Sequence, residues 1–347
     1  MPVTQSDLYD QVISFDNLLA AYYAARKGKR YRREVAVFAI NLEENLLNIH
    51  NHLVWGSWQP GRAREFRIYE PKQRDIQAPP FADRIVHHAL IGVVEPYFER
   101  RFIHHSYACR TGKGAQRACW AVQGMIRQTQ RGGINPWLVK ADIKSFFSSI
   151  DHDVLFCAIR RVITCPRTLA LWRTITAAYG HEHGVGVPVG ALSSQLDGNI
   201  MMDQIDHAMT DQAGAGRYVR YMDDTIIVVP SRAAARAVLA TLSDEVSHLS
   251  LTLNPKTRIQ PASAGVDFCG YRTWATHILP RKRNIKRARK MLKNVRAHYA
   301  AGRIDLSAVR IKLSSYLAYA KHCNAHNTTT AILDQLVLTR RPEPPHA

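Results

Sequence analysis

Two adjacent aspartates, Asp223 and Asp224, interrupt a run of residues that is otherwise typical of paired β-strands. The flanking segments, 218–221 and 225–229, are rich in aromatic and β-branched residues, which suit a pleated surface. The pattern predicts a β-hairpin with both carboxylates at its tip, because a tight turn tolerates Asp. Neighbouring like charges repel each other. A divalent cation such as Mg²⁺ is the usual reason for such a pair, and a solvated acidic turn is the alternative.

A further carboxylate, Asp142, lies near the end of another short strand pattern at residues 137–143. Nucleotidyl transfer can use two cations about 3.5–4 Å apart, which clamp the attacking and the leaving oxygen. Holding two such ions takes at least two carboxylates from neighbouring strands beside a backbone carbonyl, and Asp142 with Asp223 supplies that pair. Asp151 and Asp153 follow an apolar run and are better explained as residues that start a helix.

Residues 142–150 resemble the first catalytic motif of reverse transcriptases, and Tyr221-Met222-Asp223-Asp224 resembles their YxDD box. Further segments resemble other blocks of that family in the same order along the chain: 66–76, 83–90, 106–114, 186–199, 253–257 and 268–271. The resemblance implies an α+β right-hand polymerase with fingers, a palm built on an antiparallel sheet, and a helical thumb. It also implies RNA-directed DNA polymerase activity, with template RNA, cDNA and dNTPs as partners and two Mg²⁺ ions per active site, which Mn²⁺ can replace.

The resemblance and the apolar spacing together divide the chain into expected regions. These are an N-terminal helical extension (1–60), fingers (61–135), palm (136–275), a basic helical thumb (276–340) and a disordered tail (341–347). Within the extension, two helical patterns flank a basic turn at 27–30. The length leaves no room for a ribonuclease H or endonuclease domain.

The family resemblance also implies roles for single residues. The expected catalytic and metal-binding groups are Asp142, Asp223, Asp224, the backbone carbonyl of Ile143, and Lys256, which would protonate the leaving pyrophosphate. The expected nucleotide-binding residues are Lys72, Arg74, Phe147, Val189, Gly190 and Gln195. The expected primer and template contacts are Gly270, Tyr271, Lys282, Lys286, Arg289 and Lys293. A solvated charge pair is the alternative for Lys72 and Arg74, and an ordinary surface lysine is the alternative for Lys256.

Phe147 matches the position of a steric gate. A flat aromatic ring beneath the sugar leaves no volume for a 2′-hydroxyl, so deoxynucleotides are preferred. The preceding Phe146 points to the opposite face and is expected in the core.

The net charge of +19 and the isoelectric point near 9.9 point to a polyanionic partner, and nucleic acid is the default. No acidic residue occurs between Asp267 and Asp305. A helical reading of that segment places Lys282, Lys286, Arg289 and Lys293 on one face, where they would contact phosphates. A merely solvated or membrane-surface helix is the alternative.

The six cysteines show no CxxC spacing, so a structural zinc site is not expected. No signal peptide opens the chain and no apolar run reaches transmembrane length, which predicts a cytoplasmic, bacterial or phage-encoded protein without membrane contact.

Residues 187–195 narrow the resemblance, because Val189 stands where most reverse transcriptases carry glutamine. An aliphatic residue before the glycine is similar to the reverse transcriptases of diversity-generating retroelements. That subgroup implies a template-repeat RNA, error-prone copying at adenines and a small, helical, oligomeric accessory protein. One segment departs from its pattern: Leu196-Asp197-Gly198-Asn199 stands where that pattern has an aromatic or aliphatic pair followed by Ala-Asn. A glycine inside a helix costs about 1 kcal/mol relative to alanine. The alternatives are a defence-associated bacterial reverse transcriptase and a catalytically silent RNA-binding scaffold. The three carboxylates argue against the scaffold.

Overall fold

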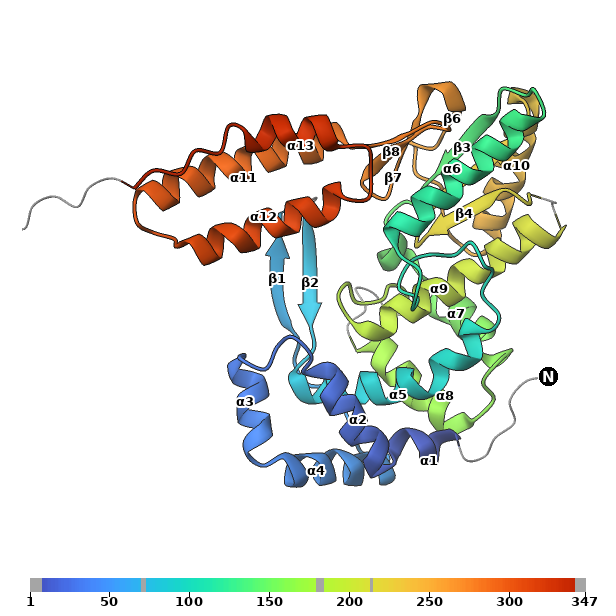
Figure 1. Cartoon of the computed structure of the whole chain (residues 1–347). Helices are drawn as coiled ribbons and strands as arrows, with labels where there is room; N and C mark the ends of the chain where they lie inside the picture. Colours follow the sequence, from blue (N-terminus) through green and yellow to red (C-terminus); the bar gives the residue numbers. More distant parts are fainter. Residues whose placement is uncertain (1–7, 70–72, 179–183, 213–214, 341–347) are drawn as a thin grey trace, which may run out of the picture.

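The computed structural model describes residues 8–69, 73–178, 184–212 and 215–340, and Figure 1 shows how their helices and strands are arranged. The mixed α and β composition with antiparallel sheets confirms the fold class expected from the sequence. The tail at 341–347, predicted to be disordered, lies outside the described residues.

The N-terminal region is helical, as predicted, but it contains more helices than the two expected patterns. The helices are α1 (Leu8–Ile13), α2 (Phe15–Ala25), α3 (Arg33–Ile40) and α4 (Leu42–Val54). The first pattern is split because the Ser14 side chain accepts a hydrogen bond from the Asn17 amide and so starts a new helix. Helix α3 was not predicted because its apolar residues occur on exposed as well as buried sides: Val37 and Ile40 are exposed while Val35 is buried, so no clear 3.6-residue period marks the helix.

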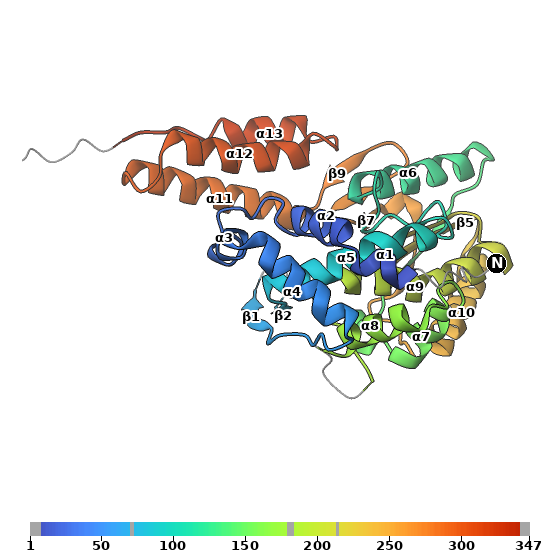
Figure 2. The same cartoon turned by 90° about the horizontal axis from the view of Figure 1, so that it is seen from below.

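A two-stranded hairpin and a long buried helix follow. Strand β1 (Arg64–Ile68) pairs antiparallel with β2 (Arg74–Ala78), which confirms the expected strand pair. Most of β1 is exposed, and the hairpin stands out from the body of the molecule (Figure 1). Helix α5 (Phe81–Glu99) then packs against α1, α2 and α3 in the N-terminal layer (Figure 2).

The central sheet has the strand order β4-β5-β3-β6, and all its pairs are antiparallel. Its strands are β3 (Trp137–Ala141), β4 (Tyr218–Tyr221), β5 (Asp224–Val229) and β6 (Arg258–Pro261). Alternate residues of the inner strands enter different cores, with Leu138 on one face and Val139 on the other. Helix α6 (Ala115–Arg131) contacts β4 and β5, and helix α10 (Arg232–His248) contacts β3, β5 and β6.

Three further helices lie beneath the sheet in sequence order: α7 (His152–Arg160), α8 (Pro166–Ala177) and α9 (Leu192–His207). The Asp151 carboxylate accepts the Asp153 and Val154 amides, which confirms its predicted role in starting α7. Helix α9 is buried along most of its length and continues into a π-helical turn, Ala208–Gln212. Its Asp197 accepts a 2.8 Å hydrogen bond from the indole nitrogen of Trp172 in α8.

The C-terminal region begins with a small sheet of β7 (Val266–Phe268), β8 (Tyr271–Thr273) and β9 (Ile278–Pro280). Three helices follow and share a small core of their own: α11 (Lys282–Ala300), α12 (Leu306–Ala320) and α13 (His326–Leu333). Together they project away from the central sheet (Figure 1). None of the helices in the described ranges is both long and apolar enough to cross a bilayer.

Candidate active site

The sheet register brings the three predicted carboxylates to one place. Ala141 pairs with Thr225, so the next residues along the two strands, Asp142 and Asp224, face each other where β3 ends and β5 begins. Tyr221 pairs with Asp224 across a two-residue turn of Met222 and Asp223, which confirms the predicted hairpin with aspartates at its tip. Met222 has a left-handed φ of 58°, and all three carboxylates are half-buried.

Asp224 has the most perturbed environment of the three. Burial is the main cause that raises its pKa to about 7, the nearby charges of Asp142 and Asp223 raise it further, and Lys140 opposes them. The Lys140 ammonium lies 3.7 Å from Oδ2. The other oxygen, Oδ1, is buried without a hydrogen-bond partner among the described residues. An additional positive charge here would offset the repulsion among Asp142, Asp223 and Asp224, and it would give Asp224 Oδ1 a partner.

This donor set fits a hard cation that is completed by its substrate. Within the described residues, no group of three or more His, Cys, Asp or Glu side chains is arranged to enclose a metal ion. Mg²⁺ seldom needs such an enclosure, because proteins hold it through one or two carboxylates, waters and substrate phosphates. Two carboxylates such as Asp142 and Asp223 are within the number that an ion of this kind takes from a protein.

Asp142 is held in place by a turn that follows α10. Asn254 donates from Nδ2 to Asp142 Oδ2 at 3.0 Å, and the Asn254 backbone N–H donates to the Asp142 carbonyl at 2.7 Å. The same Asn254 accepts the Lys256 amide at 3.0 Å, so Lys256 sits exposed on a turn bonded to the carboxylate. The function of Asn254 as a support was missed, because the two residues lie 112 positions apart.

Of the residues expected to bind the nucleotide, Phe147 lies between the β4–β5 hairpin and α9: a Cβ on Gly198 of α9 would be 3.0 Å from Met222 Sδ and 3.4 Å from Phe147 Cε1. Phe146 is buried, which confirms its place in the core, and Phe147 is half-buried with its ring centroid 5.2 Å from that of Phe146. Val189 is half-buried and Gln195 is exposed at the start of α9. Gly190, with φ of 113°, lies against the fingers hairpin: a Cβ there would be 3.2 Å from Ile76 Cγ2.

Of the two cations expected on the β1–β2 hairpin, the structure describes only Arg74. Arg74 begins β2, opposite Ile68. Lys72 lies outside the described residues.

Gly270 and Tyr271 lie at the junction between the small sheet and the C-terminal helices. The Gly270 carbonyl accepts the Tyr319 hydroxyl at 2.7 Å and Asn284 Nδ2 at 3.1 Å. The Tyr271 ring stacks on the Tyr319 ring at 4.8 Å and is 2% exposed. The Tyr271 side chain therefore packs against the C-terminal helices. On α11, Lys282, Lys286, Arg289 and Lys293 are all exposed, while Ala288, Leu292 and Val295 are buried.

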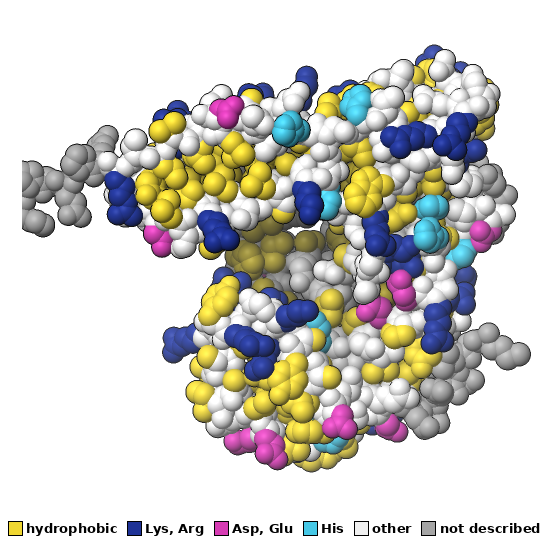
Figure 3. All heavy atoms as spheres, viewed as in Figure 1, with side chains coloured by type: hydrophobic (Ala, Val, Ile, Leu, Met, Phe, Trp, Pro, Cys, Tyr) yellow, Lys and Arg dark blue, Asp and Glu magenta, His cyan; other side chains and the backbone are white. Residues whose placement is uncertain are grey.

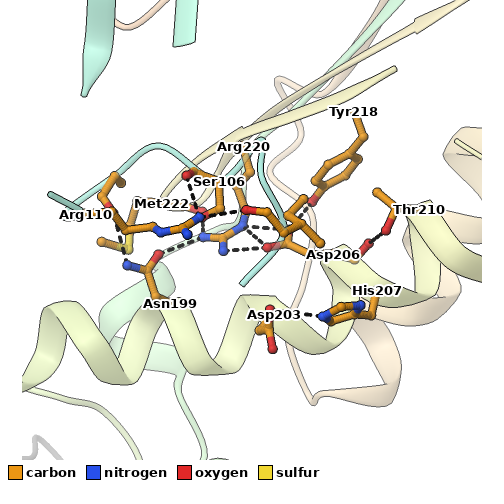
Figure 4. A network of polar contacts seen from close by, with 12 residues as sticks. Ser106, Arg110, Asn199, Asp203, Asp206, His207, Thr210, Tyr218, Arg220 and Met222 are labelled. Atoms are coloured by element: carbon orange, nitrogen blue, oxygen red, sulfur yellow. Dashed lines mark hydrogen bonds and ion pairs between the residues drawn. The ribbon is translucent and has the colours of Figure 1, made fainter. Parts of the chain in front are cut away.

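A buried ion pair, which the sequence did not reveal, supports the hairpin from behind (Figure 4). Arg220 is fully buried in β4 and binds both oxygens of Asp206 in α9, at 2.7 Å and 2.6 Å. Its Nη1 also donates to the Met222 carbonyl at 3.1 Å and to Asn199 Oδ1 at 3.0 Å. Burial works against the charged form, but the Asp206 carboxylate raises the pKa of the Arg220 guanidinium. The turn that carries Asp223 is thus bonded directly to this pair.

Arg220→Met should leave Asp206 buried without its partner and lower the free energy of unfolding by about 3–5 kcal/mol. Replacing both residues, as in Arg220→Met with Asp206→Leu, should cost less than the single change, because no unpaired charge stays inside. Tyr218→Phe is the control, since it removes one 2.8 Å hydrogen bond to Asp206 and should cost about 1 kcal/mol. Urea unfolding of the four proteins measures this, and a double variant as unstable as Arg220→Met would contradict it.

Comparison with known proteins agrees with this geometry. A family model described as reverse transcriptase (RNA-dependent DNA polymerase) matches residues 70–273, which is more than half of the chain. Protein YkfC of Escherichia coli strain K12 is 28% identical over 274 residues, covering 65% of this chain and 70% of YkfC. The group II intron-encoded protein LtrA of Lactococcus lactis subsp. cremoris is 27% identical over 173 residues, covering 47% of this chain and 28% of LtrA.

Among solved structures, apo telomerase from Candida tropicalis is similar with a TM-score of 0.53 at 11% identity, covering 80% of this chain and 60% of that chain. At this identity the likeness concerns the fold alone, and it agrees with the right-hand polymerase architecture. The chain spans most of YkfC but less than a third of LtrA. The matched family model and the carboxylates within it show that this chain belongs to the reverse transcriptase family of RNA-dependent DNA polymerases, with homology to the group II intron-encoded enzymes.

Proposed function

We propose that the protein copies a retroelement template RNA into error-prone cDNA by two-metal nucleotidyl transfer. The observation that carries the proposal is the register that sets Asp142 opposite Asp224 beside the Asp223 turn. In this proposal residues 61–135 are the fingers, 136–275 the palm and 276–340 the thumb. Val189 supports the assignment to a diversity-generating retroelement, with an accessory protein as partner and the cytoplasm of a bacterial cell as location.

In the proposed reaction the 3′-hydroxyl of the primer attacks the α-phosphate of a dNTP, and pyrophosphate leaves. Asp142, Asp223 and the Ile143 carbonyl would hold the ions, which would neutralise charge on the phosphates and assist deprotonation of the hydroxyl. Asp224 supports them from behind, and its bond to Lys140 keeps it on the protein side of the site. Lys256 lies on the Asn254 turn that is bonded to Asp142, and in this proposal it would protonate the leaving pyrophosphate.

Asp223→Asn should abolish dNTP incorporation and leave affinity for RNA unchanged, because Asp223 is assigned to metal binding rather than to phosphate contacts. Primer extension in Mg²⁺ and a filter-binding assay measure the two quantities. Asp153→Asn is the matched control, since the Asp153 side chain is 90% exposed on α7, and it should retain full activity. An Asp223→Asn protein that extends primers at an appreciable fraction of the wild-type rate would refute the metal assignment, and an inactive wild-type protein would favour the scaffold alternative.

The exposed cations of α11 should bind the nucleic-acid backbone. Figure 3 shows a hollow between the C-terminal and N-terminal helices, with Lys and Arg side chains on both rims. The double change Lys286→Gln with Lys293→Gln should weaken binding to all sequences alike. It should also reduce the slope of log affinity against log salt by about 0.7–0.9 for each lost contact. The control is Arg160→Gln with Arg236→Gln, which removes two exposed cations from α7 and α10. If both double variants give the same slope of log affinity against log salt, the basic face of α11 is only solvated and does not bind phosphates.

Val189→Gln should raise copying fidelity. Valine offers only an apolar surface beside the incoming nucleotide, whereas glutamine can donate and accept hydrogen bonds. One such bond contributes about 0.5–1.5 kcal/mol, and about 1.4 kcal/mol is a tenfold change in selectivity. Sequencing of cDNA made on one defined RNA measures the error frequency, with Val37→Gln on the exposed face of α3 as control. Identical error spectra for wild type and Val189→Gln would mean that valine only packs there.

A further inference from the structure

Gly198 of α9 packs at close range against residues of the candidate nucleotide site. A Cβ on this residue would lie 3.0 Å from Met222 Sδ, 3.1 Å from Phe146 Cε1 and 3.4 Å from Phe147 Cε1. The first two distances are shorter than an ordinary contact between such atoms, which is about 3.5–4.0 Å. One added methyl group would therefore have to displace the nearest side chains by a few tenths of an ångström.

The neighbours differ in how freely they can yield. Phe146 is 3% exposed and enclosed by the main core. The backbones of the other two are tied down, since the Phe147 carbonyl accepts the Val187 amide at 2.8 Å and the Met222 carbonyl accepts Arg220 Nη1 at 3.1 Å. Displacement thus falls on side chains rather than on backbone. Among the rings, only the half-buried Phe147 has an open side.

We propose that Gly198 is a positioning residue for the incoming nucleotide. By carrying no side chain, it lets the Phe147 ring and the Met222 side chain lie back against α9, and this sets the depth of the space beneath the sugar. A larger residue would displace the Met222 side chain and the Phe146 ring, and the Phe146 ring, whose centroid lies 5.2 Å from that of Phe147, would push the Phe147 ring toward the nucleotide. Gly198 acts through Phe147 and Met222 and touches no reacting atom. The inference rests on the proposed role of Phe147 as the gate.

Gly198→Ala tests the inference in single-nucleotide primer extension on a defined RNA template. The KM for dNTP should rise about tenfold, which corresponds to about 1.4 kcal/mol and lies within the range for one methyl group forced into a packed site. kcat should change much less, and rNTPs should stay excluded. Gly124→Ala in α6 and Gly92→Ala in α5 are matched controls, because a Cβ at either position meets nothing within 4 Å. Both should keep the wild-type KM.

A double-mutant cycle with Phe147→Val separates this effect from a general loss of structure. Phe147→Val alone should admit rNTPs. In that background Gly198→Ala should no longer raise the KM for dNTP, because the ring that it displaces is gone. If Gly198→Ala does not fold, the double variant Gly198→Ala with Met222→Ala is used instead, because it removes the nearest atom. Its KM for dNTP is compared with that of Met222→Ala alone. The same rise is expected, and the same loss of that rise when Phe147→Val is added.

The outcomes separate the inference from the proposed gate. If Phe147→Val leaves rNTPs excluded, Phe147 is not the gate and the inference is overturned with it. If Phe147→Val admits rNTPs but Gly198→Ala keeps the KM of the Gly124→Ala control, the gate stands and the inference fails. A fall in kcat alone, or an equal rise in KM with and without Phe147, would also overturn it, because either result would mean a merely structural role.

Discussion

The position of the β4–β5 turn, which carries Asp223, depends on the guanidinium of Arg220, which has no exposed surface. It binds Asp206 and Asn199 of α9 and the Met222 carbonyl, while its own backbone is bonded to His105 and Tyr107. A buried ion pair is weak support for stability, since desolvation offsets most of the attraction. The pair instead fixes the orientation of the turn, because a bidentate guanidinium cannot shift without leaving a buried charge unpaired. The turn is thereby held in one orientation before any substrate arrives, as precise positioning of a reacting group requires.

The local parts of this fold could be predicted from the sequence, whereas the long-range supports could not. The β4–β5 hairpin, the Asp151 cap and the exposed basic face of α11 each follow from a pattern within one short segment. Asn254 reaches Asp142 across 112 positions, and no local pattern reports that contact. Tyr271 bonds to and stacks on Tyr319, 48 positions later, and no local pattern predicts that contact either.

The electrostatics of the carboxylates bear on how the proposed ions enter the site. Burial and the neighbouring aspartates raise the pKa of Asp224 to about 7, although Lys140 opposes them. A carboxyl group with that pKa is partly protonated at neutral pH, so the protein itself lessens the repulsion among the three side chains. Two carboxylates leave most ligand positions of an octahedral ion open, which favours an ion that arrives together with the triphosphate.

Asp197 and Gly198 depart from the family pattern, and the structure accounts for each by its surroundings. Asp197 is buried beside Trp172, and burial raises its pKa to about 7 despite the hydrogen bond from the indole. The group can therefore lie inside α9 in its neutral form at little electrostatic cost. Gly198 gives up helix propensity and gains the close packing of α9 against Met222 and the two phenylalanines. Neither change disturbs the carboxylates or the Arg220 pair, so the departure is compatible with an intact polymerase site. Val189, whose apolar surface replaces a hydrogen-bonding group, is then the residue on which the proposed low fidelity depends.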